Sequence, residues 1–516
     1  MCFEEGYCEV PLVPSRLICG ESRLIPRAMT TVEVTSMVSK FGDAAYRTKQ
    51  EDFDGVEIDG SGGFLVSDFF SLCTNKRIDK YGGNILDRCR FALEIIADIK
   101  KKCGSEFPVG LRLCADEQGP GRLSVHEITA IAAILEDGGL DYINIADKSA
   151  DEIKRTVNIP VIGLEETGDA FIADVVIKQG NCDFVSMDKA SIADPEMPKK
   201  LSAGRFDEII ACIGCRQGCS ARINKFGFGS CALNLCSICE NDSPAATSTA
   251  KKSVLVVGGG VGGMQAAITA ARAGHSVTLI EQNNHLGGQF CFAAMPPEKG
   301  EITAFIVWQQ TQLTKLGVMI LMDTEATPDL IDALEPNVVV VATGAVPLVS
   351  PIQGAKKQNV FTPQQVFEGE CLPGSHCVVV GGGIVGCETA QYLEHHGVHV
   401  TAIVESLPDI LQDMPDGLRS YFLRIFSASD TRIMTQTAAK KISDGGVIVA
   451  HDGNDKVLEA DFIVMATGYT LNNKLLKQLS EKPYQVFAVG DVIKARSAHE
   501  TIRESFEVIQ SLQYHM

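Results

Sequence analysis

The chain has 516 residues and a formal net charge of −19, with 45% hydrophobic and 6% aromatic residues. At the usual ~150 residues per domain, this length predicts about three domains, each with enough chain to bury a core. The excess of acidic side chains excludes nucleic acid and anionic membranes as default partners, because binding to phosphates depends on lysine and arginine.

The number of cysteines and the N-terminal sequence indicate the cellular compartment. The sequence has 18 cysteines, and its first ten residues contain neither the basic region nor the apolar run of a secretory signal. Thiols or metal ligands in a reducing compartment are therefore expected instead of a disulfide framework, and the protein is predicted to be cytoplasmic. The uncharged stretch at residues 253–271 contains a glycine-rich loop pattern, which predicts a strand, a loop and a helix and not a membrane span.

The N-terminal part alternates short apolar runs with helical periodicity. Helices are predicted at residues 85–103 and 125–135. Strands are predicted at residues 53–58, 108–115, 141–146, 159–164 and 182–187. This repetition of strand and helix is typical of a parallel sheet in an α/β fold.

A cysteine-rich segment follows, with the spacing Cys212-x2-Cys215-x3-Cys219-x11-Cys231. Three closely spaced thiolates and a fourth brought back by a loop suit an iron–sulfur cluster or zinc. The spacing is unusual for zinc, and free buried thiols are the remaining alternative. A further pair, Cys236 and Cys239, is interpreted as surface or packing thiols, because four ligands are already present. The polar residues 241–252 read as a linker.

Two similar units come after the linker, and each is a strand, a glycine-rich turn, a helix and a second strand that ends in glutamate. Such glycines let a backbone approach a pyrophosphate at a helix N-terminus, and the acid can bind a ribose diol. A tight strand–helix turn can also need glycine for packing alone, and Glu405 can be a solvated strand-end acid. The key residues are Gly258, Gly260, Gly263 and Glu281 in the first unit and Gly381, Gly383, Gly386 and Glu405 in the second.

The order of these units resembles that of two-dinucleotide-binding flavoproteins of the disulfide-reductase type. The matching segments are residues 338–344, 462–468 and 486–491. The resemblance implies Rossmann-like domains with FAD at the first unit, where Gly344, Gly490 and Asp491 also contact FAD, and a nicotinamide dinucleotide at the second. There Glu405 would repel a 2′-phosphate, which favours NADH over NADPH.

Together with this module, the cysteine segment resembles that of the 2,4-dienoyl-CoA reductase, 2-enoate reductase and trimethylamine dehydrogenase family, which implies a [4Fe-4S] cluster. Residues 26–34, 53–65, 75–83, 109–116 and 183–205 resemble the old yellow enzyme-like (β/α)8 barrel of that family. The expected organisation is a partial barrel at residues 1–205, a cluster segment at 206–240, a linker at 241–252, an FAD-binding domain at 253–372 and 469–516, and an NAD(P)H-binding domain at 373–468.

The barrel departs from the family pattern. Its first three β/α units have no counterpart, although Arg112 matches the flavin-facing arginine of the family, and Lys189 is the remaining cation for an FMN phosphate. The phosphate region instead contains Glu165, Glu166 and Asp188, and the proton-donating tyrosine position is Phe64. We therefore expect little or no FMN, irregular packing of residues 1 to about 50, and an open side that buries apolar strand faces. Positions Asp59 and Gly62 replace substrate-anchoring histidines, so no catalytic residue is assigned.

The predicted function is an NADH-dependent oxidoreductase that passes hydride to FAD and single electrons to a [4Fe-4S] cluster. The family implies a small-molecule enoate or enone-type substrate with an activated C=C bond, and it leaves a homo-oligomer open. Two alternatives remain. One is an electron-transfer module whose degenerate barrel docks a redox partner protein, and the other is a catalytically dead, truncated paralogue.

Overall fold

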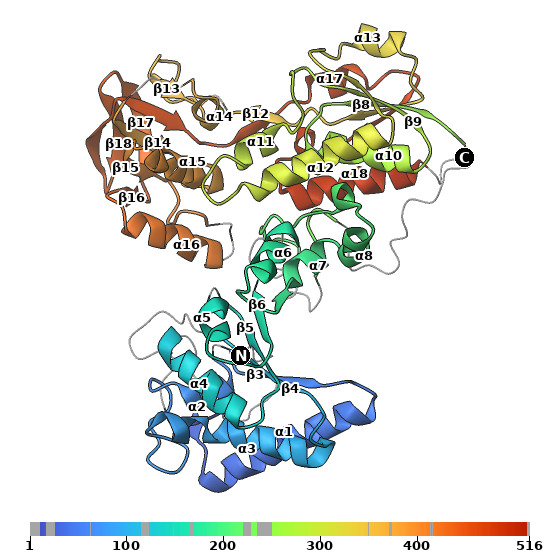
Figure 1. Cartoon of the computed structure of the whole chain (residues 1–516). Helices are drawn as coiled ribbons and strands as arrows, with labels where there is room; N and C mark the ends of the chain where they lie inside the picture. The colour runs from blue at the N-terminus through green and yellow to red at the C-terminus, as the bar shows by residue number, and fades with distance from the viewer. Residues whose placement is uncertain are drawn as a thin grey trace. The chain divides into compact units, whose positions relative to one another are not determined.

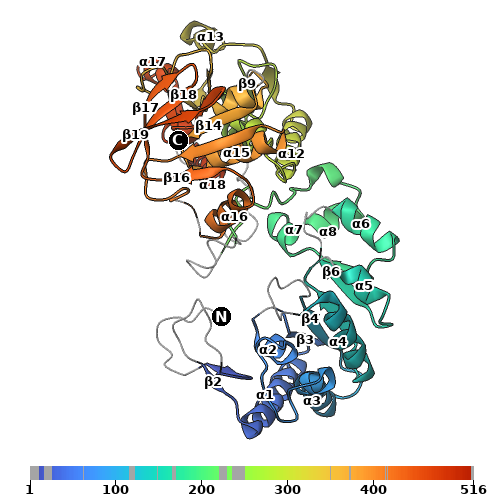
Figure 2. The same ribbon diagram turned by 90° about the vertical axis from the view of Figure 1, so that its left-hand side faces the viewer.

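The computed structural model divides the chain into two compact units, residues 1–188 and 189–516, and each is described by itself (Figures 1 and 2). The structure describes residues 11–16, 26–61, 63–114, 123–147, 149–164, 170–219, 229–234, 250–348, 350–370, 374–412, 414 and 416–512. In these ranges no helix combines the length and the apolar composition that a bilayer crossing requires.

The first unit contains a five-stranded parallel sheet with the strands in chain order, which confirms the predicted α/β class. Each predicted strand is present, with ends within three residues of those expected. The strands are β3 (Val56–Asp59), β4 (Val109–Leu113), β5 (Tyr142–Ile145), β6 (Val161–Leu164) and β7 (Phe184–Ser186). The helices after α1 are α2 (Leu65–Phe70), α3 (Ile85–Cys103), α4 (Val125–Asp137), α5 (Ala150–Lys154) and α6 (Ala170–Lys178).

One face of this sheet is apolar and buried. Ile58, Leu111 and Ile143 lie in one core with side chains of α3 and α4. The alternate residues point to the opposite face, since successive side chains of a strand alternate. That face carries Glu57, which is exposed, and Asn144, whose amide donates to the Glu57 carboxylate at 3.2 Å. On β6 and β7 the same face carries Ile162 and Phe184, which pair in register with Asn144 and with each other. The expectation that the open side buries apolar strand faces stays a prediction.

A regular helix, α1 (Thr31–Gln50), begins close to the N-terminus of the first unit. Thr30 accepts a hydrogen bond from the Glu33 amide at 3.2 Å, and the Glu33 carboxylate accepts one from the Thr30 amide at 2.8 Å. This reciprocal cap satisfies two of the free amides at the helix start. The buried face of α1, which includes Val34, packs in the core with α3. The expected irregular packing of residues 1 to about 50 is therefore wrong for residues 31–50.

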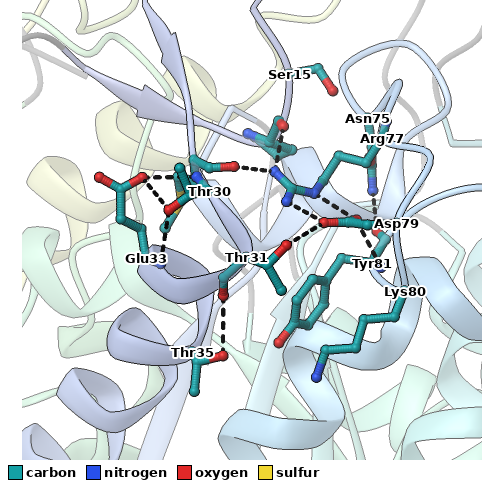
Figure 3. A network of polar contacts seen from close by, with 12 residues as sticks. Ser15, Thr30, Thr31, Glu33, Thr35, Asn75, Arg77, Asp79, Lys80 and Tyr81 are labelled. Atoms are coloured by element: carbon teal, nitrogen blue, oxygen red, sulfur yellow. Dashed lines mark hydrogen bonds and ion pairs between the residues drawn. The ribbon is translucent and has the colours of Figure 1, made fainter.

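A polar network joins the start of α1 to the segment before α3 (Figure 3). The Arg77 side chain, 8% exposed, donates to the carbonyls of Pro14 at 3.0 Å and Met29 at 2.5 Å and forms an ion pair with Asp79 at 2.5 Å. Asp79 also accepts from the Thr31 hydroxyl at 2.9 Å. The two carbonyls that Arg77 binds follow directly after two short paired strands, β1 (Leu12–Val13) and β2 (Arg27–Ala28).

The second unit contains two parallel five-stranded sheets, and each is the centre of one of the two glycine-loop units; we call these units the first and second nucleotide folds. The first nucleotide fold has the order β10-β9-β8-β11-β22, and the second has the order β13-β20-β14-β15-β16. The strands of the first are β8 (Ser253–Val257), β9 (Ser276–Ile280), β10 (Met319–Leu321), β11 (Val338–Val341) and β22 (Gln485–Ala488). Those of the second are β13 (Val360–Phe361), β14 (His376–Val380), β15 (His399–Val404), β16 (Arg432–Met434) and β20 (Phe462–Met465).

The chain leaves the first nucleotide fold after β11 and returns to it for β22. The two crossings pair as an antiparallel ribbon, β12 (Ala345–Pro347) with β21 (Tyr469–Leu471). A three-stranded antiparallel sheet, β17 (Ala438–Ser443), β18 (Gly446–His451) and β19 (Asn454–Glu459), packs on the second fold. Strand β13 belongs to the second sheet, although it precedes the boundary expected at residue 372.

Helices cover both folds of the second unit. In the first fold, α10 (Val261–Arg272) packs against both α12 (Glu301–Lys315) and α18 (Ala498–Ser511), and the three helices lie together in Figure 1. The second fold carries α14 (Pro363–Phe367), α15 (Ile384–His395) and α16 (Asp416–Ser427). The remaining helices and helical turns are α7 (Asp188–Ala193), α8 (Met197–Ser202), η1 (Phe206–Glu208), α11 (Gln289–Ala293), α13 (Pro328–Ala333), α17 (Lys474–Gln478) and η3 (Gly490–Val492).

Candidate functional site

The first glycine loop lies between β8 and α10. Gly258 has a φ of +107°, and a Cβ on Gly263 would lie 1.9 Å from the Gly258 carbonyl oxygen, so both positions require glycine for the strand–helix turn itself. Gly260 differs, because a Cβ there would meet no atom within 4 Å. Gly260 is the N-cap of α10, so open space adjoins a helix N-terminus, which favours an anion.

Glu281 follows β9 and is fixed beside this loop. One of its carboxylate oxygens accepts from the Gly259 amide at 2.6 Å, and the other accepts from the Asn283 amide at 2.8 Å. The residue is 7% exposed. A carboxylate has about four acceptor positions, so two backbone donors leave capacity for a ribose diol.

The second glycine loop, between β14 and α15, repeats this geometry. A Cβ on Gly386 would lie 2.0 Å from the Gly381 carbonyl oxygen, whereas a Cβ on Gly383 would meet nothing within 4 Å. The Glu405 carboxylate accepts from the Gly382 amide at 2.7 Å and from the Leu407 amide at 2.9 Å. Glu405 is therefore not a freely solvated strand-end acid, because it is bonded to the loop.

Three other sequence-predicted residues lie in the same unit. Gly344 follows β11 and has a φ of +67°. Gly490 follows β22, and its amide donates to the Glu504 carboxylate at 2.9 Å. The Asp491 carboxylate accepts from the Arg496 amide at 3.0 Å, and burial raises the pKa of Asp491. The C-terminal ends of β8, β11 and β22 lie at the same end of the sheet, because these three strands are neighbours and run parallel.

The four cysteines of the C-x2-C-x3-C-x11-C segment are all half-buried. Burial raises the pKa of Cys215, and the neighbouring Cys212 and Cys219 thiols raise it further. Burial likewise raises the pKa of Cys231 to about 11, with smaller contributions in the same direction from Cys215 and Cys212. Cys215 and Cys231 therefore each lie within electrostatic reach of Cys212.

Backbone contacts shape the cysteine segment. The Gly214 amide donates to the Cys212 sulfur and the Leu233 amide donates to the Cys231 sulfur, each at 3.4 Å. Gly218 lies against the segment that returns at Ser230, since a Cβ on Gly218 would be 2.2 Å from the Ser230 carbonyl oxygen. Amide donors to sulfur stabilise thiolates and tune iron–sulfur clusters.

In the described residues, no three cysteine, histidine, aspartate or glutamate side chains converge as the ligands of one metal ion would. The soft sulfur donors of this segment suit iron–sulfur clusters and zinc alike.

Residues 8–208 match the NADH:flavin oxidoreductase / NADH oxidase family, and residues 252–507 match the pyridine nucleotide-disulphide oxidoreductase family. The NADH oxidase of Thermoanaerobacter brockii is 37% identical over 527 residues, covering 96% of this chain and 81% of that relative. The cinnamate reductase of Clostridium sporogenes is 31% identical and covers 98% of this chain and 83% of that relative.

The chain belongs to the 2,4-dienoyl-CoA/enoate reductase family. A solved structure of 2-naphthoyl-CoA reductase with 2-naphthoyl-CoA superposes with a TM-score of 0.91 at 30% identity, covering 96% of this chain and 79% of that one. This enoate reductase-family protein is therefore an oxidoreductase with a flavin-type domain and a pyridine nucleotide-type domain.

In the barrel part of this enoate reductase-family enzyme, Arg112 lies on β4 and is half-buried. Its Nε is buried and has no hydrogen-bond partner within the described ranges. Lys189 lies on α7, which begins at the boundary of the second compact unit, whereas Arg112 belongs to the first unit. Phe64 is the N-cap of α2 and is 44% exposed. The expected replacements at Gly62, Glu165 and Glu166 fall outside the described residues.

Sequence reasoning missed a charged contact between the two nucleotide folds of this enzyme. Lys299, in the loop before α12, forms an ion pair with Glu388 on α15. Glu388 is 8% exposed and lies two residues after Gly386. A signal was present in the sequence, because Glu388 is a charged residue within the apolar helix that follows the second glycine loop.

Proposed function

We propose that the protein oxidises NADH at the second glycine loop, holds FAD at the first and holds a [4Fe-4S] cluster at Cys212, Cys215, Cys219 and Cys231. One observation carries this proposal. Ile210 and Leu233, which flank the cysteines, are buried in the core of the first nucleotide fold, and Cys231 itself packs against that core. A cluster at the four thiols would therefore adjoin the fold that we assign to FAD.

The cysteine segment is attached to this fold by polar contacts as well. The Asp194 carboxylate, 2% exposed, accepts from the Lys200 ammonium at 2.6 Å and from the Ile210 amide at 3.0 Å. Lys315 on α12 pairs with Asp207 at 2.6 Å. These contacts hold the start of the cysteine segment on α12 and α8, which fixes the position of its thiols relative to the first glycine loop.

Each bound group would supply a distinct chemistry: NADH donates a hydride, FAD converts a hydride into single electrons, and the cluster transfers electrons one at a time. The chain binds and orients these groups. The N-termini of α10 and α15 attract the pyrophosphates, and the Glu281 and Glu405 carboxylates accept hydrogen bonds from ribose hydroxyls. Beside Glu405 a 2′-phosphate would meet a carboxylate, which supports NADH as the reductant.

The corresponding domain boundaries are also proposals. We assign residues 1–205 to the partial barrel, 206–240 to the cluster segment, 241–252 to the linker, 253–372 with 469–516 to the FAD-binding domain, and 373–468 to the NADH-binding domain. The pairing of β13 with β20 supports moving residues 350–370 to the NADH-binding domain.

The terminal acceptor that we propose is a small conjugated acid or thioester. Two relatives support this class by name, the cinnamate reductase and the 2-naphthoyl-CoA reductase. The unpartnered Nε of Arg112 supports a flavin contact in the barrel. Against a fully competent barrel stands Phe64, which has no hydroxyl to donate a proton. A redox partner protein as the acceptor remains the second candidate for this reason.

The test combines composition and kinetics on protein purified without oxygen. We expect about four irons and four acid-labile sulfides per chain, FAD in a heat extract, and flavin reduction on mixing with NADH. Zinc without sulfide, or a flavin that NADH does not reduce, would overturn the proposal. The amount of FMN in the same extract, and its loss in Arg112→Ala, measures whether the barrel holds a second flavin. Turnover with cinnamate and with a dye separates the two acceptors.

A further inference from the structure

Two histidines begin neighbouring strands of the second nucleotide fold. His376 is the first residue of β14, and His399 is the first residue of β15. The two residues pair in register across these parallel strands, and the His399 amide donates to the Ser375 carbonyl at 2.8 Å. This pairing brings the two imidazole rings side by side at one end of the sheet.

The separation of the rings suits a shared metal ion. Their centroids lie 5.3 Å apart, and their planes meet at 79°. In a tetrahedral site the metal–nitrogen distance is about 2.0–2.1 Å, and two ligands subtend about 109° at the metal. Adding about 1.1 Å from each nitrogen to its ring centroid places two such centroids roughly 5 Å apart. The observed separation therefore matches that of two imidazoles on one ion.

Hydrogen bonds determine which nitrogen of His376 can bind a metal. The Ser375 hydroxyl lies 3.3 Å from an oxygen of the Asp461 carboxylate, which can only accept, so the hydroxyl donates to Asp461. The Nδ1 atom of His376 lies 2.8 Å from the same hydroxyl oxygen and must therefore donate its own hydrogen. The Nε2 atom keeps its lone pair, which is the state of a nitrogen that ligates a metal ion.

Asp461 is fixed behind His376. It directly precedes β20, and its Oδ2 accepts from the His376 amide at 2.9 Å and from the Ser375 amide at 2.8 Å. These hydrogen bonds lower the pKa of Asp461, so the group is a carboxylate at neutral pH. The same oxygen lies 3.7 Å from His376 Nδ1. A carboxylate in this place orients a histidine ligand and raises its basicity.

The histidine pair lies at the end of the second fold that is opposite to the glycine loop. His376 is the first of the five residues of β14, whereas the loop follows the last of them. At about 3.3 Å per residue, the strand separates the two places by roughly 15 Å. The His376 and Asp461 side chains are 55% and 53% exposed. An ion can therefore reach the pair from solvent without displacing a dinucleotide.

We propose that His376 and His399 together bind one divalent transition-metal ion, such as Zn²⁺ or Ni²⁺, for which imidazole is a suitable ligand. Ser375 and Asp461 orient His376 for this ion. Since no third side chain of a ligating type converges here within the described ranges, water completes the coordination. The ion joins the starts of two strands and so stabilises the second fold, whatever reaction the protein performs.

The test titrates Ni²⁺ into the full-length protein, purified without oxygen, by isothermal calorimetry. We expect one ion per chain at this site, and His376→Asn and His399→Asn should each weaken its binding by at least about tenfold, which is about 1.4 kcal/mol. Ser375→Ala should cause a smaller loss, because it removes only the group that orients His376. The cysteine segment is the same in all variants, so any ion that it binds cancels in the comparison.

Two other histidines supply the matched control. The rings of His395 and His396, at the end of α15, have centroids 5.6 Å apart. The His396 ring, however, lies 4.1 Å from the Tyr392 ring, and its Nδ1 is 2.8 Å from the Tyr392 carbonyl oxygen, which hold it on the helix. His395→Asn should therefore leave the Ni²⁺ affinity unchanged.

Thermal unfolding gives a second readout. An ion that binds only the folded chain raises the Tm. Ni²⁺ should therefore raise the Tm of the wild type and of His395→Asn by more than that of His399→Asn.

Each outcome decides a claim. Equal Ni²⁺ affinity in the wild type and in the double variant of His376 and His399 overturns the site. Binding that is lost in His395→Asn and kept in His399→Asn assigns the ion to the helix end and also overturns it. An unchanged affinity in Ser375→Ala overturns the orienting role. If His376→Asn does not fold, His399→Asn carries the same test, since His399 is exposed.

Discussion

Gly383 and Gly386 of the second glycine loop allow effects on folding stability to be separated from effects on ligand binding. In Gly383→Ala the new Cβ meets no protein atom within 4 Å, and the backbone there has φ −72° and ψ 179°, which alanine adopts without strain. Alanine loses some N-cap preference, roughly 0.5–1 kcal/mol, and gains about as much by restricting the unfolded chain. We therefore expect the Tm to stay within about 2 °C of the wild type.

Binding should respond differently. If the pyrophosphate of NADH approaches the backbone at Gly383, the methyl group occupies the space that the phosphate needs. We expect the KM for NADH to rise at least about tenfold, which corresponds to about 1.4 kcal/mol. The assay is dye reduction at varied NADH, with FAD content measured by absorbance and expected to be unchanged. An unchanged KM would refute the reasoning, because the open space would then not be the phosphate site.

Gly386→Ala is the matched control for this experiment. Its Cβ would lie 2.0 Å from the Gly381 carbonyl oxygen, so the strand–helix turn must open by more than about 1 Å. Overpacking of this kind costs about 1–3 kcal/mol, which lowers the Tm by several degrees with or without NADH. In the first fold, Gly260→Ala should lower FAD content and leave the affinity for NADH unchanged.

Three further predictions follow from the cluster, the cofactor acid and the barrel. Cys215→Ala should lose iron, sulfide and the broad visible absorption of the cluster while FAD stays bound, and retention of a full iron content would contradict the ligand assignment. NADH should reduce the flavin faster than NADPH at equal concentration in stopped-flow mixing, because Glu405 repels a 2′-phosphate; a faster reaction with NADPH would show the opposite. The Arg77 guanidinium lowers the pKa of Asp79 to about 2 from 3.8, so its stabilisation is complete above about pH 4 and disappears as the pH falls through 2. Asp79→Asn should cost about 2 kcal/mol of unfolding free energy at neutral pH in a denaturant titration, whereas Asp151→Asn, at an exposed ion pair, should cost almost nothing.

Local signals in the sequence predicted the strands and the glycine loops well. Both depend on residues close together in the chain, such as Gly381 and Gly386, whose backbones approach each other in any strand–helix turn of this kind. The sequence signal for the start of α1 is equally local, since Thr30 and Glu33 have the spacing of a capping box. The expectation of irregular packing there gave too much weight to the barrel pattern and too little to this cap.

Contacts between distant residues could not be predicted in the same way. Lys299 and Glu388 are separated by 89 positions, and no periodicity links a loop of one fold to a helix of the other. The same is true of the anchoring of the cysteine segment, where Asp194 meets Ile210. Within β3, by contrast, the alternation of Val56, Glu57, Ile58 and Asp59 separates one apolar face from one acidic face.

The β12–β21 ribbon also bears on how such a protein could have been assembled. Ala345 lies opposite Leu471, so the second nucleotide fold enters and leaves the first at the same point. Strand β11 ends before this point and β22 begins after it, and both still pair in register in the first sheet. A gene segment encoding the second fold can therefore be inserted, exchanged or removed without altering the sheet that receives it. Tolerance of domain insertion depends on such adjacent chain ends.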